Sequence, residues 1–318
     1  MSASLEDVTA KVDAGERLSN EDVSALQSSR DIIALGMLAS TVRQRLRGSE
    51  VTYVRVADLK VEDMADPKVD DMADLKVGTT ANDGATNGPT VVVPTFRSAG
   101  EIRIFQTPHT LDAAISIVEK ARDMAGNTPL SAFCLYELGK LPEGLPVVLT
   151  ALKQAGLDTI TQAPIDRLNE PERALEALAD AGLELARLTV NETPNAEWTA
   201  VCRDVATLQT RLRTIRVFAP LARKIDATQP TTGYEDVRRI AISRVLADNV
   251  NTIQVDWSLY GPKLAQVALT FGADDIDSVS AGDDPSRGPR RSTVEEIRRS
   301  IQAAGFEPVE RDGRFARR

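Results

Sequence analysis

The feature that most constrains the fold is a regular alternation of strand-like and helix-like segments. Eight short apolar or β-branched runs are strand candidates: VTYVRV (51–56), EIRIF (101–105), LSAFCL (130–135), LDTIT (157–161), LELARLTV (183–190), RTIRVFAP (213–220), NTIQVDW (251–257) and DIDSVS (275–280). Segments with helical periodicity lie between most of them. Such alternation predicts a parallel sheet with right-handed crossovers, and eight units favour a closed (β/α)8 barrel of the TIM type over an open doubly wound sheet.

Glycines and capping residues mark the ends of these helical segments. The patterns LDAAISIVEKARDMAG, PVVLTALKQAG, PERALEALADAG and PKLAQVALTFG each end in glycine, which commonly follows the last turn of a helix. Thr232 with Glu235, and Ser292 with Glu295, have the spacing of a capping box. These signals support the assignment of the intervening segments as helices.

The chain ahead of the first strand is expected to be helical as well. Apolar residues recur there at steps of three and four, Ser19 is a plausible N-cap and Gly48 a plausible stop. Residues 1–50 are therefore predicted to form a helical extension, and residues 51–318 the barrel.

One crossover, over residues 57–100, lacks a helical pattern. It begins with the octads ADLKVEDM and ADPKVDDM and the start of a third. An eight-residue period drifts around a helix and builds no constant apolar face, and Pro67 would interrupt a helix. We interpret the segment as a weakly ordered, acidic, low-complexity insertion. A metal-binding loop is the alternative, but the glycine turn of a calcium loop is absent.

Composition limits the function classes. The net charge of −9 and the pI of about 4.9 argue against nucleic-acid binding. The chain has no apolar run of about 18 residues and its polar start does not resemble a signal peptide, so no membrane association is expected. GxGxxG and P-loop motifs are absent. Cys134 and Cys202, the two cysteines, are expected to be reduced, packed thiols of a cytoplasmic protein.

The strand NTIQVDW offers candidate pocket residues. Gln254 and Asp256 alternate, so both are expected to face one side, and the inward side near the end of a barrel strand leads to the pocket. Asp256 and Trp257 then line a pocket. The alternative is that Trp257 packs the barrel mouth and Asp256 pairs with a nearby arginine.

Other polar residues are open to a structural interpretation as well as a functional one. Asp274, Asp275 and Asp277 form an acidic cluster that is open to reading as a divalent-metal site or as caps and solvated charge. Arg244 and Asp248, four residues apart, are predicted to form an exposed helical ion pair.

The single histidine, His109, is read as a turn residue after Pro108 rather than as an acid–base group.

Three longer stretches carry a family resemblance. They are residues 18–56, residues 231–279 and AAGFEPVERDGRF (303–315). The second, TTGYEDVRRIAISRVLADNVNTIQVDWSLYGPKLAQVALTFGADDIDSV, is the most specific. Together they resemble a radical S-adenosylmethionine family that comprises aminofutalosine synthase, dehypoxanthine futalosine cyclase and the second subunit type of deazaflavin synthase. The resemblance implies a place near menaquinone biosynthesis by the futalosine route.

The same resemblance shows what this chain lacks. The family places CxxxCxxC after the first strand, where three thiolates hold a [4Fe–4S] cluster that binds S-adenosylmethionine. Here the octads stand in that place and contain no cysteine. The family's glycine-rich segments are replaced by FQTPHT (105–110) and TQAPID (161–166). TVNET (189–193) keeps Glu192 but has Val190 at the position of a family histidine. We therefore expect both cofactors to be lost.

These observations leave several functions open. The first is a non-catalytic relative that binds a futalosine-like or chorismate-derived ligand, or serves as an accessory subunit for an active homologue or as a homo-oligomer. The second is a cluster-independent enzyme that uses rim carboxylates as acid and base. A true radical enzyme would need more thiolates than two. The candidate pocket residues are Glu192, Gln254, Asp256, Trp257 and Asp277.

Overall fold

The structure is a computed structural model that describes residues 4–59, 98–192, 197–224, 232–282 and 293–318. The octads after Leu59 lie outside these residues, as does most of the expected insertion. The first strand is longer than expected, since β1 (Glu50–Leu59) includes the first three residues of the first octad.

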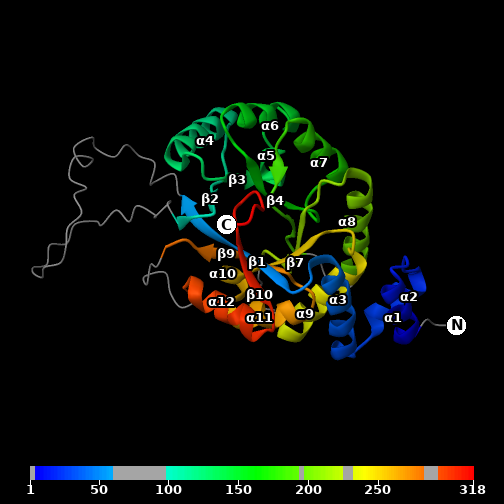
Figure 1. Cartoon of the computed structure of the whole chain (residues 1–318). Coiled ribbons are helices and arrows are strands. Elements are labelled where there is room, and N and C mark those ends of the chain that lie inside the picture. Colours follow the sequence, from blue (N-terminus) through cyan, green and yellow to red (C-terminus); the bar gives the residue numbers. More distant parts are fainter. Residues whose placement is uncertain (1–3, 60–97, 193–196, 225–231, 283–292) are drawn as a thin grey trace, which may run out of the picture.

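The strands form a closed parallel barrel, as the sequence predicts (Figure 1). Around it follow β1, β2 (Glu101–Ile104), β3 (Leu130–Cys134), β4 (Thr159–Pro164), β5 (Glu184–Leu185) with β6 (Leu188–Val190), β7 (Val217–Ala222), β8 (Thr252–Asp256) and β9 (Asp275–Ser280). β5 and β6 are two pieces of the one expected fifth strand, and both pair with β4. β9 pairs with β1, which closes the barrel.

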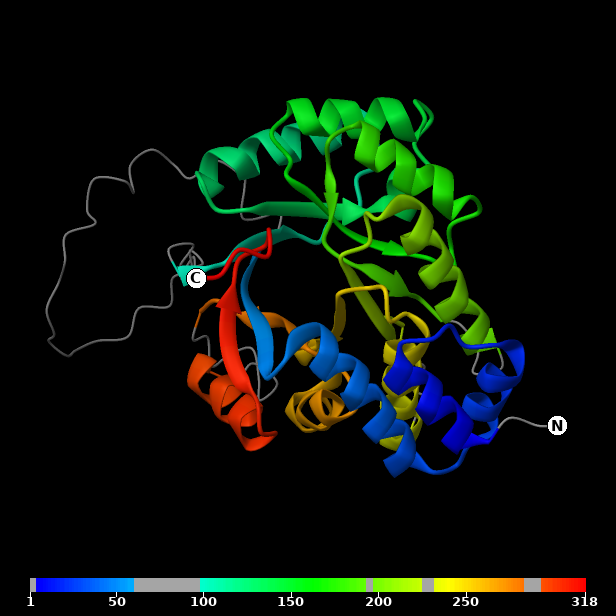
Figure 2. The ribbon, with the colours of Figure 1, turned by 45° about the vertical axis from the view of Figure 1, so that its right-hand side comes forward.

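Helices follow the strands and cover the outside of the barrel (Figures 1 and 2). They are α4 (Leu111–Ala125), α5 (Leu135–Leu138), α6 (Leu145–Gln154), α7 (Pro171–Asp180), α8 (Trp198–Leu212), α9 (Gly233–Leu246), α10 (Trp257–Tyr260), α11 (Pro262–Thr270) and α12 (Val294–Ala303). Thr232 caps α9 as expected, and α12 is capped by Thr293, while the predicted cap Ser292 lies outside the described residues. None of the described helices is long and apolar enough to cross a membrane.

The N-terminal extension consists of three helices, α1 (Leu5–Ala14), α2 (Asn20–Ser28) and α3 (Ile32–Arg47). Ser19 caps α2 and Gly48 ends α3, in agreement with the sequence. Asp31 starts a new helix because its carboxylate accepts hydrogen bonds from the first free amides of α3. The extension packs on the barrel mainly through α3 and α9.

A further strand was not expected from the sequence. β10 (Glu307–Arg311) pairs in parallel with the first half of β1, on the side where β2 pairs with the second half. Its residues are mostly half-buried and polar, so the segment lacks the apolar alternation that marks a strand.

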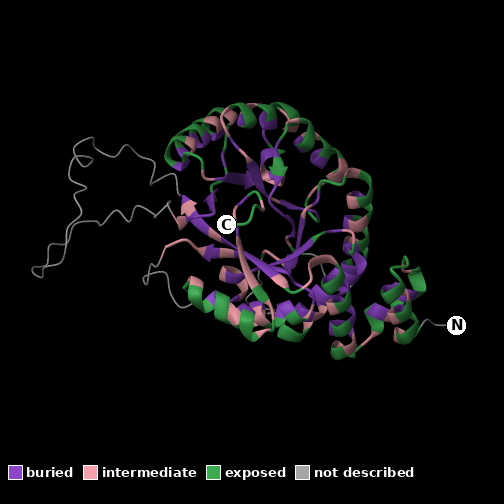
Figure 3. Cartoon of the chain, in the orientation of Figure 1, coloured by how far each residue is buried: buried purple, intermediate pink, exposed green. Residues whose placement is uncertain are grey.

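The barrel strands are largely buried on both faces (Figure 3). All four residues of β2 are buried, yet two of them, Glu101 and Arg103, are charged. Side chains alternate across a strand. Ile102 and Ile104 therefore join the apolar core, and the two charged side chains point to the inside of the barrel, where they find partners.

Candidate functional site

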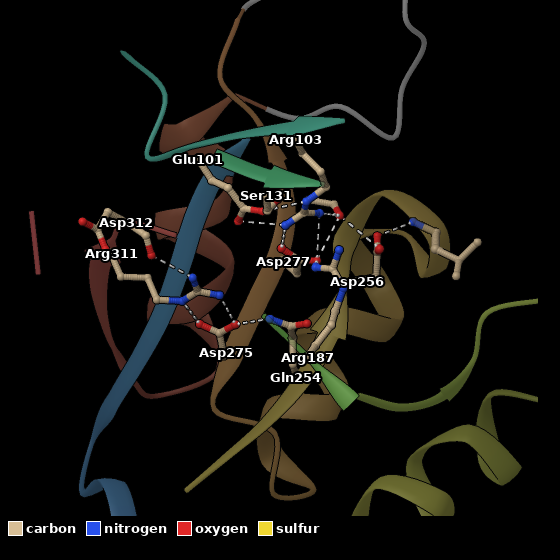
Figure 4. A network of polar contacts seen from close by, with 12 residues as sticks. Glu101, Arg103, Ser131, Arg187, Gln254, Asp256, Asp275, Asp277, Arg311 and Asp312 are labelled. Atoms are coloured by element: carbon tan, nitrogen blue, oxygen red, sulfur yellow. Dashed lines mark hydrogen bonds and ion pairs between the residues drawn. The ribbon is translucent and has the colours of Figure 1, made fainter. Parts of the chain in front are cut away.

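The inside of the barrel is filled by a network of ion pairs (Figure 4). We call it the interior network. Its charged members are four carboxylates and four guanidinium groups: Glu101, Asp256, Asp275, Asp277, Arg103, Arg187, Arg223 and Arg311. The formal charges of these eight groups cancel, which offsets the cost of removing them from water.

Asp277 lies at the centre of this network. It accepts hydrogen bonds from Arg103, at 2.9 Å between Oδ1 and Nη2, and from Arg187. Arg103 also binds Glu101 in bidentate fashion, at 2.8 and 2.9 Å. Ser131 donates a further hydrogen bond to Glu101. Burial alone would raise the pKa of Glu101, but the neighbouring guanidinium of Arg103 overrides it and holds that pKa at about 2.

A second part of the network ties β10 to the barrel. Arg311 of β10 donates to both oxygens of Asp275, at 2.6 and 2.7 Å. Thr52 and Gln254 donate to the same carboxylate, at 2.5 and 2.7 Å. These interactions outweigh the effect of burial and lower the pKa of Asp275, so the carboxylate is fully ionised and fixed in place.

Asp256 links the network to the barrel mouth. Its Oδ2 lies 2.8 Å from Nη1 of Arg223 and 3.0 Å from the Oγ of Ser278, which donates to it. The other oxygen caps α10 by accepting from the amide of Leu259. Pairing with an arginine was one of the two readings of Asp256 and is confirmed. Trp257 is buried, in agreement with the packing alternative.

A cavity of about 500 Å³ lies at the mouth, where the carboxyl ends of β2, β3, β4 and β6 meet the segment after β7. We call it the mouth cavity. Aromatic residues (Phe105, Phe133, Tyr136) and polar or charged residues (Cys134, Gln162, Arg167, Glu192, Arg223, Lys224) line it. Thr161 and Thr189 also line it, and their buried hydroxyls have no hydrogen-bond partner among the described residues. Its position and size suit a small ligand.

The five predicted pocket residues lie at different depths. Glu192 lines the mouth cavity, and its Oε1 is 2.5 Å from the Nζ of Lys224. Asp256 borders an adjoining pocket of about 230 Å³, which shares Phe105 and Arg223 with the mouth cavity. Gln254 and Asp277 are buried below, in the interior network, and Trp257 is buried and lines neither pocket. Their role as ligand contacts stays a prediction.

The carboxylates of the acidic cluster before and within β9 form ion pairs with arginines. Each of Asp274, Asp275 and Asp277 pairs with at least one buried guanidinium. Within the described part of the chain, no group of three or more histidine, cysteine or acidic residues is placed to hold a metal ion. The arrangement therefore favours structural ion pairs over the metal reading.

The predicted exposed pair of Arg244 and Asp248 is wrong. Arg244 is fully buried and binds Asp274, with 2.5 Å between Nη2 and Oδ2. Asp248 instead lies 3.6 Å from a guanidinium nitrogen of Arg45. Helix α9 is covered by α3 and α11, which leaves few exposed positions on it, and the spacing of four residues carries no information about this burial.

His109 lies in an exposed bend after Pro108 and does not line the mouth cavity, in agreement with its reading as a turn residue.

Sequence reasoning missed most of the interior network. Five of its eight charged members, Glu101, Arg103, Arg187, Arg223 and Arg311, were not singled out. The signal that was available is a charged residue at alternate positions of a run that is otherwise apolar, as in EIRIF. A charge in such a place needs a buried partner.

Comparison with known proteins defines the relationship of the chain. A family profile described as the CofH/MqnC C-terminal region matches residues 201–318. The aminodeoxyfutalosine synthase of Thermus thermophilus is 26% identical over 355 aligned residues, covering 97% of this chain and 94% of that protein. The cyclic dehypoxanthine futalosine synthase of Streptomyces coelicolor is 25% identical over 349 residues, covering 97% and 88%.

Residues 201–318 thus match the CofH/MqnC C-terminal family, and the chain as a whole is similar to two enzymes of the futalosine pathway, which supports the resemblance to a divergent radical S-adenosylmethionine family member. Among solved structures, methylornithine synthase (PylB) superposes with a TM-score of 0.64 at 12% identity, over 95% of this chain and 97% of that one. At that level of identity the likeness concerns the fold alone.

The residues present in this chain do not fit the cysteine-ligated cluster that the family resemblance implies. Cys134 ends β3 at the mouth cavity, and burial raises the pKa of its thiol. Cys202 lies in α8 outside the barrel, 3.4 Å from the Oγ of Ser243, and burial raises its pKa to about 12. These are the two cysteines of the whole sequence, and a cluster of the family type needs three convergent thiolates.

Proposed function

We propose that this protein is a ligand-binding relative of the futalosine-pathway enzymes that works without the radical step. Its ligand would be a small molecule held at the carboxyl ends of the strands, where barrels of this kind bind their substrates. The relationship to aminodeoxyfutalosine synthase and cyclic dehypoxanthine futalosine synthase supports a ligand of futalosine-like or chorismate-derived chemistry.

The observation that carries the proposal is the contrast between the cavity and the cysteines. The mouth cavity persists and is lined by aromatic and polar side chains, which is the composition of a small-molecule site. The two thiols, by comparison, lie on opposite sides of the barrel wall, one at the mouth and one between α8 and α9. A site that keeps its cavity and lacks its cluster ligands is suited to binding rather than to radical generation.

The alternative, an enzyme that uses rim carboxylates as acid and base, has less support. A general acid or base at neutral pH needs a pKa near the working pH. The guanidinium of Arg223 overrides the effect of burial and lowers the pKa of Asp256. Asp277 is enclosed between two guanidinium groups, and Glu192 is paired with Lys224. All three carboxylates are thus engaged in ion pairs.

An accessory role with an active homologue, or self-association, belongs to the same proposal. The side chains of Ile33 and Met37, one turn apart on α3, are 71% and 67% exposed. Exposed apolar pairs of this kind occur at protein interfaces. Recovery of an active family member with this protein from native cells, in equal amounts, would support the accessory role.

The chemical part of the proposal is tested by anaerobic reconstitution with iron and sulfide. We expect no [4Fe–4S] absorbance and no 5′-deoxyadenosine from S-adenosylmethionine above a protein-free control. Calorimetric titration with futalosine and with adenosine should, in contrast, give saturable binding. Formation of 5′-deoxyadenosine that Cys134→Ala abolishes would overturn the proposal, and so would failure of every tested ligand to bind.

A further inference from the structure

The floor of the mouth cavity presents hydrogen-bond donors that lack partners. The hydroxyls of Thr161 on β4 and Thr189 on β6 are buried, border the cavity and have no partner in the described residues. β4 and β6 are paired neighbours, so both hydroxyls belong to the same part of the wall. Buried polar groups nearly always have a hydrogen-bond partner. Two neighbouring hydroxyls that border a cavity and have no such partner indicate that a molecule bound in the cavity provides the partner.

Arg187, which immediately precedes β6, carries two more donors in the interior network, behind the residues that line the mouth cavity. Its side chain is 1% exposed, and its Nη1 donates to Asp277. Its Nε and Nη2 have no partner within the part of the chain that the structure describes. A guanidinium nitrogen can only donate, so the missing partner of Arg187 must be a hydrogen-bond acceptor.

The charge around Arg187 favours a negatively charged acceptor. Burial lowers its pKa well below the ordinary value, and the cations of Arg103 and Arg223 lower it further, ahead of the opposing effects of Glu101 and Asp256. The carboxylate that Arg187 contacts, Asp277, is shared with Arg103. The formal charges of the interior network cancel as a whole, so an added anion would act on Arg187 by offsetting the repulsion from Arg103 and Arg223.

We propose that Thr161 and Thr189, with Arg187 behind them, form a subsite for an oxyanion, either a carboxylate or a phosphate group of the ligand. The oxyanion accepts hydrogen bonds from the two hydroxyls, and its negative charge stabilises the buried guanidinium of Arg187. The rest of the ligand occupies the cavity above, against Phe133 and Tyr136. This inference rests on the proposed function, because it names the chemical group that the mouth cavity receives.

Conservative variants test the subsite without disturbing the fold. Thr161→Val and Thr189→Val keep the shape of the side chain and remove a hydroxyl that has no protein partner among the described residues. Thr159→Val is the matched control, because Thr159 is buried on β4 two residues earlier and does not line the cavity. Full-length protein is titrated with sodium phosphate and with sodium benzoate at constant ionic strength, with chloride as the reference anion, and Kd is measured by calorimetry and thermal shift.

We expect saturable binding of at least one probe, weakened roughly ten- to a hundred-fold by either cavity variant and unchanged by the control. Preference for phosphate or for benzoate identifies which oxyanion the ligand carries. Equal affinity of wild type and cavity variants would overturn the subsite while leaving the ligand-binding proposal intact. Binding of futalosine or adenosine without any binding of the two anions would have the same meaning. Absence of all binding would overturn both.

Discussion

Replacing Asp277 by asparagine should destabilise the barrel strongly, because this carboxylate neutralises two buried cations. Its side chain is fully buried and accepts from Arg103 and from Arg187. Asparagine keeps the size but removes the charge. Arg103 retains Glu101, whereas Arg187 loses the carboxylate that it contacts. An unpaired buried charge of this kind costs about 3–5 kcal/mol in the free energy of unfolding.

Urea unfolding at pH 7, followed by circular dichroism, measures this cost. The matched control is Glu170→Gln, which breaks an exposed pair with Arg173 and should cost less than about 1 kcal/mol. In the double variant Asp277→Asn with Arg187→Met, the formal charge of the network is balanced again. The double variant should therefore lose about 1–3 kcal/mol less than the sum of the single variants. A cost for Asp277→Asn equal to that of the surface control, or strict additivity, would refute the reasoning.

Two further predictions concern the pH dependence of stability and the replacement of a glycine that has a positive φ. The pKa of Glu101 is lowered from 4.5 to about 2, so its ionised carboxylate contributes about 3 kcal/mol to the free energy of unfolding above pH 4.5, and this contribution is lost as the pH falls toward 2. The variant Glu101→Gln should therefore show a flatter decline in the free energy of unfolding between pH 5 and 3. An unchanged slope would contradict the assignment. Gly272 has φ of +102°, and an added Cβ would lie 2.9 Å from the Cβ of Arg244, so Gly272→Ala should cost about 3 kcal/mol in urea unfolding. Gly15→Ala should cost about 1 kcal/mol, because φ is also positive there but the nearest atom, Nη1 of Arg45, lies at an ordinary contact distance of 3.5 Å. Equal costs would show that Arg244 moves aside.

The barrel was predictable because its signals are local. Strand and helix periodicities repeat over short windows, and caps such as Ser19 and Thr232 act within one turn. β10 was not predictable in this way, since its polar, half-buried sequence gains strand geometry only by pairing with β1.

The interior network illustrates the same limit for the site. Arg103 and Asp277 are 174 positions apart, and no local pattern links them. Asp256 and Gln254 were recognisable as inward-facing because they alternate in an apolar strand, while their partners come from other strands. Thr161 and Thr189 begin the segments TQAPID and TVNET that the family resemblance marks, but nothing in the sequence singles out the threonines themselves, because a threonine in a strand is ordinary and only the closed barrel shows which hydroxyls face the cavity.

The pairing of β10 with β1 has a consequence for synthesis of the protein. β1 is among the first segments made, but its neighbour in the sheet and the guanidinium that binds Asp275 come from residues 307–311. Until those residues leave the ribosome, Asp275 has no arginine partner and the first half of β1 has a free edge on that side. Pairings between such distant segments form slowly and expose strand edges while they wait. We therefore expect the nascent chain to depend on chaperones until β10 has been made.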